Sequence, residues 1–147
     1  MVIIVDANIL IQCIIGIKGK TAALILENSS YVDFVIPEFV LEEISGKESK
    51  IYLSSNLKKP EFDRNLRLLL THLVIISDDE IPGIIFKKAY EIVKNIDVKD
   101  AIYVAFSIVF ESLLWTDDFK LQRGLKRNGF NSIVNTKEFK EIIKGLK

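Results

Sequence analysis

The sequence contains very little cysteine and histidine, with one residue of each among 147. A single cysteine cannot form an internal disulfide, so we expect the chain to work in a reducing compartment, the cytoplasm. The same scarcity excludes cysteine-based zinc and iron–sulfur sites and zinc sites built from several histidines. The metal-ligating group that the chain has in quantity is carboxylate oxygen, from 20 Asp and Glu residues.

The sequence also lacks a long apolar run and a net charge. Its mean hydropathy is positive at +0.26, but the longest apolar stretch, residues 101–110, has about half of the ~20 residues that a membrane-spanning helix needs. We therefore expect a buried core and no membrane association. The 20 basic and 20 acidic residues cancel, which excludes a uniformly basic nucleic-acid binder. The length predicts a single domain over residues 1–147.

Short β-branched runs alternate with longer helical segments along the chain. The expected strands are Val2–Val5, Phe34–Ile36, Leu73–Ile76, Leu113–Trp115 and Ser132–Val134, and the expected helical segments are 8–27, 38–57, 60–72, 80–95, 98–110, 118–127 and 137–146. Continuous apolar runs are typical of strands buried on both faces. The alternation predicts an α/β fold, a three-layer α/β/α sandwich with a mostly parallel five-stranded sheet.

Acidic residues occur where this fold would bring them together. In such sheets ligands bind beyond the carboxyl ends of the strands, where the crossover helices also begin. Asp6 follows the first strand, Glu43 lies in the second turn of the next helical segment, Asp97 and Asp100 begin segment 98–110, and Asp117 and Asp118 follow the fourth strand. Four separate segments therefore deliver acids to one edge of the sheet.

Each of these acids, taken alone, also has a structural explanation. Asp97 and Asp100 have the spacing of an N-cap and a third helical position, and acids that directly follow strands can cap the next helix. Glu43 lies on the margin of the apolar arc of its helix, whereas Glu42 points away from that arc. We therefore expect Glu43 to face the protein body and Glu42 to face water.

The convergence of several carboxylates carries more information than any one of them. Carboxylates that face each other in a partly buried cleft repel one another, which raises their pKa values. A hard divalent cation with oxygen ligands, Mg²⁺ or Mn²⁺, relieves that repulsion and supports displacement at a phosphate. Such chemistry needs no histidine base. The pattern predicts a metal-dependent enzyme of phosphodiester chemistry.

Four blocks of the sequence resemble the PIN domain nuclease family, the VapC-like ribonucleases. The blocks are Val5–Leu10, Val40–Ile44, Asp97–Phe106 and Leu114–Leu121. They occur in the family's order and span nearly the whole chain. The resemblance implies a metal-dependent endoribonuclease that hydrolyses RNA phosphodiester bonds. It also implies that the protein is the toxin of a toxin–antitoxin pair, with an antitoxin partner, and a homodimer.

The resemblance also implies roles for particular residues. The catalytic and metal-ligating set would be Asp6, Glu43, Asp100 and Asp118, with Mg²⁺ or Mn²⁺ as the cofactor. The accessory residues would be Asp97, Asp117, Asn8 and Thr116. Residue order alone leaves Asp117 and Asp118 equivalent, and the family's Thr-x-Asp spacing from Thr116 selects Asp118. Capping of the first helix is an alternative role for Asn8.

Basic residues follow Asp118 along one predicted helix. Lys120, Arg123, Lys126 and Arg127 are the candidate RNA-binding residues, because they lie near the predicted acidic edge and phosphate contacts position a nucleic acid. A second basic segment, 47–70, is either a clamp over the RNA backbone or an ordinary solvated helical hairpin.

Other classes of α/β protein fit the sequence less well. A receiver domain needs an acidic pair after the first strand, where only Asp6 is present, and a haloacid-dehalogenase-type phosphatase needs an Asp at the position of Asn8. A dinucleotide or P-loop site needs a glycine-rich turn after a strand, which the chain lacks. A catalytically inactive PIN-like module that binds RNA or protein is the remaining alternative, and the intact set of four acids argues against it.

Overall fold

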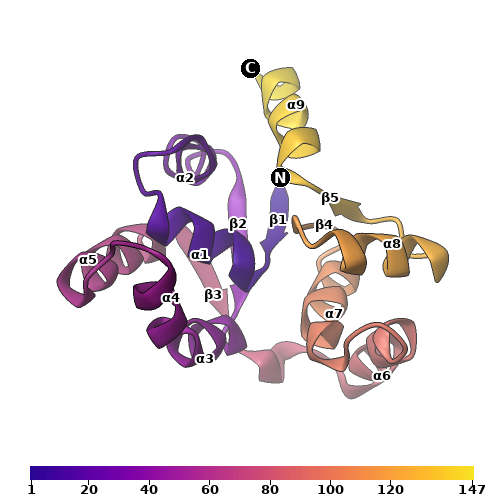
Figure 1. The fold of residues 1–147 in the computed structure, drawn as a ribbon. Helices are drawn as coiled ribbons and strands as arrows, with labels where there is room; N and C mark the ends of the chain where they lie inside the picture. Colours follow the sequence, from indigo (N-terminus) through magenta and orange to yellow (C-terminus); the bar gives the residue numbers. More distant parts are fainter.

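The computed structural model describes residues 1–147 and contains a five-stranded, wholly parallel sheet (Figure 1). The strands are β1 (Val2–Val5), β2 (Asp33–Pro37), β3 (Leu73–Ile76), β4 (Leu113–Trp115) and β5 (Ile133–Val134). Their order across the sheet is β3-β2-β1-β4-β5, and every adjacent pair is parallel. The predicted strands therefore match the observed ones to within a residue at each end.

Helices cover both faces of this sheet. They are α1 (Ala7–Ile15), α2 (Lys20–Leu26), α3 (Phe39–Gly46), α4 (Glu48–Ser54), α5 (Lys59–Leu70), α6 (Gly83–Val93), α7 (Ala101–Val109), α8 (Phe119–Arg127) and α9 (Thr136–Leu146), with short 3₁₀ turns η1 (Asp78–Glu80) and η2 (Val98–Asp100). Figure 1 shows α1 to α5 on one side of the sheet and α6 and α7 on the other. The predicted three-layer α/β/α sandwich is confirmed.

Two segments that were expected to be continuous helices are each divided in two. In segment 8–27, α1 ends at Gly16 and α2 begins after Gly19, because glycine disfavours the helical conformation. Segment 38–57 is α3 followed by α4. Pro60 lies in the first turn of α5, where the missing N–H of proline costs no hydrogen bond.

The positive mean hydropathy is explained by a large core of buried apolar residues. The apolar stretch that begins at Ala101 is buried through Ser107. Burial also raises the pKa of the Cys13 thiol, on α1, to about 12. No single helix is long and apolar enough to cross a membrane. Helices α1 and α2 would suffice only as a pair, by length and composition, and they are bent by 109° at the break between them.

Three buried aromatic side chains join the last helix to the sheet. Phe139 of α9 lies 4.7 Å from Trp115 of β4 and 6.0 Å from Phe34 of β2, measured between ring centroids. All three rings are fully buried. The indole Nε1 of Trp115 also donates a hydrogen bond of 3.0 Å to Thr136 Oγ1, at the start of α9. The end of β4, which carries the acids Asp117 and Asp118 just beyond it, is thereby held in place.

We expect Phe139→Ala to lower the free energy of unfolding by about 3–5 kcal/mol, because it opens a cavity between two other aromatic rings. The measurement is equilibrium urea unfolding followed by tryptophan fluorescence. Leu146→Ala is the matched control, since Leu146 lies on the same helix but is 51% exposed. Equal unfolding midpoints for the two variants would contradict this packing argument.

Candidate active site

A small cleft, which we call the acid cleft, lies at the carboxyl edge of the sheet. It is lined by side chains from four separate segments: Asp6, Ala7 and Asn8 after β1, Glu43 of α3, Asp100 and Tyr103 at the start of α7, and Asp118 after β4. Its volume is about 20 Å³, which is enough for one water molecule or one ion. The structure thus brings together the four carboxylates that the resemblance selected.

Asp6 is the most deeply buried acid of the cleft, with 4% of its surface exposed. Its Oδ1 accepts a hydrogen bond of 2.9 Å from the Ile9 backbone N–H and so caps α1. Burial raises the pKa of Asp6 to about 6, although the Thr116 hydroxyl and the Ile9 N–H both lower it; the charges of Asp117 and Asp118 add to the rise. The capping explanation of Asp6 is therefore confirmed, and the same residue lines the acid cleft.

Asp97 and Asp100 have different roles at the start of α7. Asp97 is exposed, and its Oδ1 accepts a hydrogen bond of 3.0 Å from the Lys99 backbone N–H, which caps η2. Asp100 is half-buried and its side chain caps nothing. The capping explanation therefore accounts for Asp97 alone, and the carboxylate of Asp100 is left to face the cleft.

The environment of Asp100 is strongly negative. Burial and then the charges of Asp97, Asp6, Asp118 and Glu43, in that order, raise the pKa of Asp100 to about 7. Burial is the largest cause of this rise, and the mutual repulsion that convergence of the acids predicted adds to it. An unneutralised cleft therefore favours the uptake of a proton by Asp100 near neutral pH.

The adjacent acids Asp117 and Asp118 have separate environments. Asp118 is half-buried in the cleft, where its Oδ1 caps α8 through the Leu121 N–H at 3.0 Å and its own N–H donates to Thr116 Oγ1 at 3.1 Å. Asp117 is exposed and accepts hydrogen bonds from the backbone N–H and the hydroxyl of Thr136, at 2.7 and 2.6 Å. The contacts therefore place Asp118 among the clustered acids and Asp117 at the start of α9.

Tyr103 is a residue of the cleft that sequence reasoning did not identify. Its hydroxyl donates to Glu43 Oε1 at 2.5 Å and accepts from the Ala7 N–H at 3.2 Å, so it connects α7, α3 and α1. The side chain is 2% exposed, and burial beside Glu43 raises its pKa far above the ordinary value. The sequence feature that could have identified Tyr103 is its position about one helical turn after Asp100, on the same side of the helix. Glu43 faces inward as predicted, while Glu42 is exposed.

The donor atoms of the cleft suit a hard divalent cation. Asp118 and Glu43 each use one carboxylate oxygen in a hydrogen bond and keep the other, and Asp100 keeps both. Asp6 accepts from the Ile9 N–H and also interacts with the Thr116 hydroxyl. All are oxygen ligands of the kind that Mg²⁺ and Mn²⁺ prefer. With the side chains as placed, no three acidic, histidine or cysteine side chains converge to ligating distance. The ligand type and charge fit the ion, and ligation requires rotation of side chains.

The accessory residue Asn8 is exposed, and its Oδ1 accepts a hydrogen bond of 3.2 Å from Lys47 Nζ. It does not cap α1, because Asp6 does. In the rest of the basic segment 47–70, Lys59 lies 3.3 Å from Glu48 and 3.5 Å from Asp63. Lys59 is therefore paired within the helical segment itself, whereas Lys47 reaches the rim of the acid cleft.

Three of the four candidate RNA-binding residues line one hollow, which we call the basic pocket. Lys120, Arg123 and Arg127 of α8 surround about 250 Å³ together with residues 95–96, and Lys126 lies outside it. None of the three forms an ion pair with an acid, although the Arg123 guanidinium lies 4.8 Å from the centre of the Phe119 ring. These cations are spread along α8 from its first turn to its last residue and form no ion pair.

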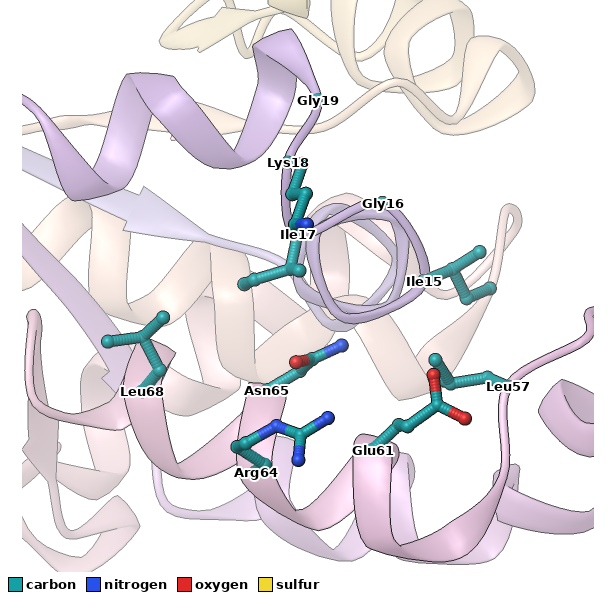
Figure 2. A pocket seen from close by; sticks show the side chains of 10 residues that line it. All are labelled: Ile15, Gly16, Ile17, Lys18, Gly19, Leu57, Glu61, Arg64, Asn65 and Leu68. Carbon is teal, nitrogen blue, oxygen red and sulfur yellow. The ribbon is translucent and has the colours of Figure 1, made fainter.

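The largest hollow of the molecule is remote from these acids (Figure 2). It has a volume of about 500 Å³ and lies between the end of α1 and the helix α5. Figure 2 shows Glu61, Arg64 and Asn65 of α5 on the side of the hollow that faces the end of α1. The Asn65 Nδ2 donates a hydrogen bond of 2.9 Å to the carbonyl of Ile14, which lies within α1. The length of α1 separates this hollow from Asp6 by about 13 Å, so it is not part of the acid cleft.

The structure is a three-layer α/β/α sandwich whose parallel sheet has clustered acids beyond its carboxyl edge. The sequence matches the PIN domain family over residues 4–140, so the chain belongs to the PIN domain family, a family of nucleases that generally use divalent metal ions. Among solved structures, it is similar to a chain in the crystal structure of VapBC2 from Rickettsia felis bound to a DNA fragment from their promoter. The two share 19% identity with a TM-score of 0.70, over 92% of this chain and 98% of that one. No curated protein sequence matches significantly.

We expect Asp100→Asn to stabilise the protein by about 1–3 kcal/mol at pH 8 in EDTA, because the folded state then no longer holds a buried charge. The folded pKa of Asp100 is raised from 3.8 to about 7, so the folded state binds more protons between these values and the wild type loses stability as pH rises through that window. The difference between variant and wild type should vanish toward pH 4. Urea unfolding at both pH values measures it, and a difference that is independent of pH would contradict this assignment.

Proposed function

We propose that the acid cleft binds Mg²⁺ or Mn²⁺ and hydrolyses phosphodiester bonds of RNA. The observation that carries the proposal is the convergence of four carboxylates from separate segments, where burial and then the charges of the neighbouring acids raise the pKa of Asp100 to about 7. Burial of unneutralised acids is unfavourable. A functional requirement for their charge, such as cation binding, explains why this fold keeps them together.

The residues have distinct roles in this proposal. Asp6, Glu43, Asp100 and Asp118 would hold the cation, and a bound cation would supply positive charge at the scissile phosphate and lower the pKa of a coordinated water. Capping bonds fix Asp6 and Asp118, because each offers one oxygen to a helix N-terminus and turns the other toward the cleft. The Tyr103 hydroxyl orients Glu43 in the same way.

The accessory residues act around this set. Thr116 holds the backbone at Asp118 through its hydroxyl and lowers the pKa of Asp6. Asn8, at the rim with Lys47, is placed to contact the substrate backbone. Asp97 and Asp117 add negative charge from outside the cleft, since their carboxylates are engaged with η2 and α9.

We propose that the RNA backbone runs from the acid cleft along α8. Lys120, Arg123 and Arg127 follow Asp118 on one face of this helix, at spacings that a strand can contact in succession. The cations offset the repulsion between the phosphates and the acidic edge. This separation of charges reconciles a formal net charge of zero with a nucleic-acid substrate.

We also propose that the protein is the toxin of a toxin–antitoxin pair that acts in the cytoplasm. The family membership and the likeness to a chain of the VapBC2 structure support an antitoxin partner. A homodimer is supported by Val74 and Ile75 on the edge strand β3, which are 42% and 43% exposed, since a second copy would shield this apolar edge.

We expect Asp100→Asn and Asp6→Asn each to reduce RNA cleavage by about 100-fold or more, because each removes a charged ligand while preserving side-chain shape. The assay follows cleavage of a labelled RNA in Mg²⁺ or Mn²⁺, and EDTA should abolish it. Asp33→Asn is the matched control, because Asp33 is an exposed aspartate at the opposite end of β2. Equal cleavage by all variants would point to a contaminating nuclease, and no cleavage by the wild type would favour an inactive binding module.

We expect the double variant Arg123→Ala, Arg127→Ala to weaken RNA binding and to reduce the slope of log affinity against log salt by about 2, one for each lost phosphate contact. Lys126→Ala should change the affinity and the salt slope less, per removed charge, than the double variant does, since Lys126 lies on the same helix but outside the basic pocket. Fluorescence anisotropy at several salt concentrations measures both. If the loss of affinity per removed charge is the same for the double variant and for Lys126→Ala, then charge alone, without the pocket, explains binding.

A further inference from the structure

A fourth hollow, which we call the aromatic pocket, lies between α3, η1, α6 and the start of α7. Phe39, Asp78, Phe86, Val98, Lys99 and Ile102 line it, and its volume is about 310 Å³. The mouth is apolar and open, since Phe86 is 42% exposed and Val98 is 50% exposed. No function described so far uses this pocket.

The aromatic pocket adjoins the acid cleft. Lys99 and Ile102 lie on either side of Asp100 in the chain, and Phe39 lies one helical turn before Glu43. Both hollows are built at the carboxyl edge of the sheet, where Figure 1 shows η1 crossing between α3 and α6. A strand that places a phosphate in the acid cleft therefore has a neighbouring nucleotide within reach of this pocket.

The lining selects a neutral, planar group with polar edges. Asp78 Oδ1 is 3.4 Å from the Phe39 N–H that donates to it, so the carboxylate keeps acceptor capacity for a further N–H group. Lys99 supplies a donor for a carbonyl oxygen. A phosphate would be repelled by Asp78, whereas a nucleobase is uncharged, offers N–H and C=O groups on its edge, and stacks on an aromatic ring.

We propose that the aromatic pocket binds an unpaired nucleobase of the RNA strand whose phosphate lies in the acid cleft, with the base stacked on Phe86. This inference rests on the proposed function, because the acid cleft supplies the adjoining phosphate site. A base can enter the pocket only after it has left a duplex. The pocket therefore gives the protein a preference for single-stranded RNA.

The test compares two aromatic residues of α6. Phe86→Ala removes the stacking ring, and Tyr90→Ala is the matched control, because Tyr90 is also 42% exposed on the same helix but does not line the pocket. Both are made on an Asp100→Asn background, which is expected to slow cleavage by about 100-fold or more, and are assayed in Mg²⁺ at low salt so that the strand stays intact during the measurement. Fluorescence anisotropy with a short labelled single-stranded RNA should show affinity reduced about tenfold by Phe86→Ala and unchanged by Tyr90→Ala.

Two further comparisons separate stacking from a structural role. Phe86→Trp keeps an aromatic ring and should keep the affinity, whereas Phe86→Leu keeps an apolar side chain without a ring and should lose it. Binding of the same sequence as a duplex should not respond to Phe86→Ala. Equal thermal unfolding midpoints for the variants verify that each is folded, as expected for a half-exposed side chain.

Three outcomes would overturn the proposal: equal effects of Phe86→Ala and Tyr90→Ala, equal effects on single-stranded and duplex RNA, or no binding of the single strand at all. Dissociation of a dimer by Phe86→Ala in sedimentation experiments, with RNA affinity unchanged, would instead assign the pocket to a second copy of the chain. Because binding is measured without cleavage, an inactive wild type whose RNA binding still depends on Phe86 would refute the proposed nuclease and leave the nucleobase site intact.

Discussion

Repulsion among the carboxylates of the acid cleft is the constraint on which the rest of the structure depends. Asp6 and Asp100 are withdrawn from water near other acids, and their pKa values rise to about 6 and about 7. The fold holds them there through helix capping by Asp6 and Asp118 and through the Tyr103 hydroxyl on Glu43. Burial of the apolar core stabilises the fold and offsets the unfavourable free energy of placing these acids close together.

The parallel sheet divides the chemistry of the surface among neighbouring sites. Because every strand runs in the same direction, the carboxyl ends of β1 and β4 and the starts of α3, α7 and α8 share one edge. The acid cleft lies at this edge, the basic pocket extends from it along α8, and the aromatic pocket lies beside it near η1. The three sites differ in chemistry: clustered carboxylates, unpaired cations and exposed aromatic surface, which under the proposed function would meet the cation, the phosphates and a base of one RNA strand.

Much of the fold and of the acid set could be predicted because both depend on local patterns. Continuous apolar runs identified the strands, and Asp6 and Glu43 could be placed by their distance from strand ends and by helical angle. The break at Gly16 was missed, since the apolar pattern continues through it. Tyr103 was missed because its partners are Ala7 and Glu43, 96 and 60 residues away, and a hydroxyl on a buried helix resembles any other core tyrosine.

By itself, the sequence determined the class of fold, the segments that carry the acids and the shortage of any metal ligand other than oxygen, because these follow from composition and short-range periodicity. The tertiary structure gave Asp117 and Asp118 their separate contacts, which residue order alone does not distinguish: Asp117 binds Thr136 of α9, and Asp118 lines the acid cleft. It alone assembled the aromatic pocket, whose rings Phe39 and Phe86 come from helices on opposite sides of the sheet. Packing between distant segments decides such contacts, and no local pattern encodes them.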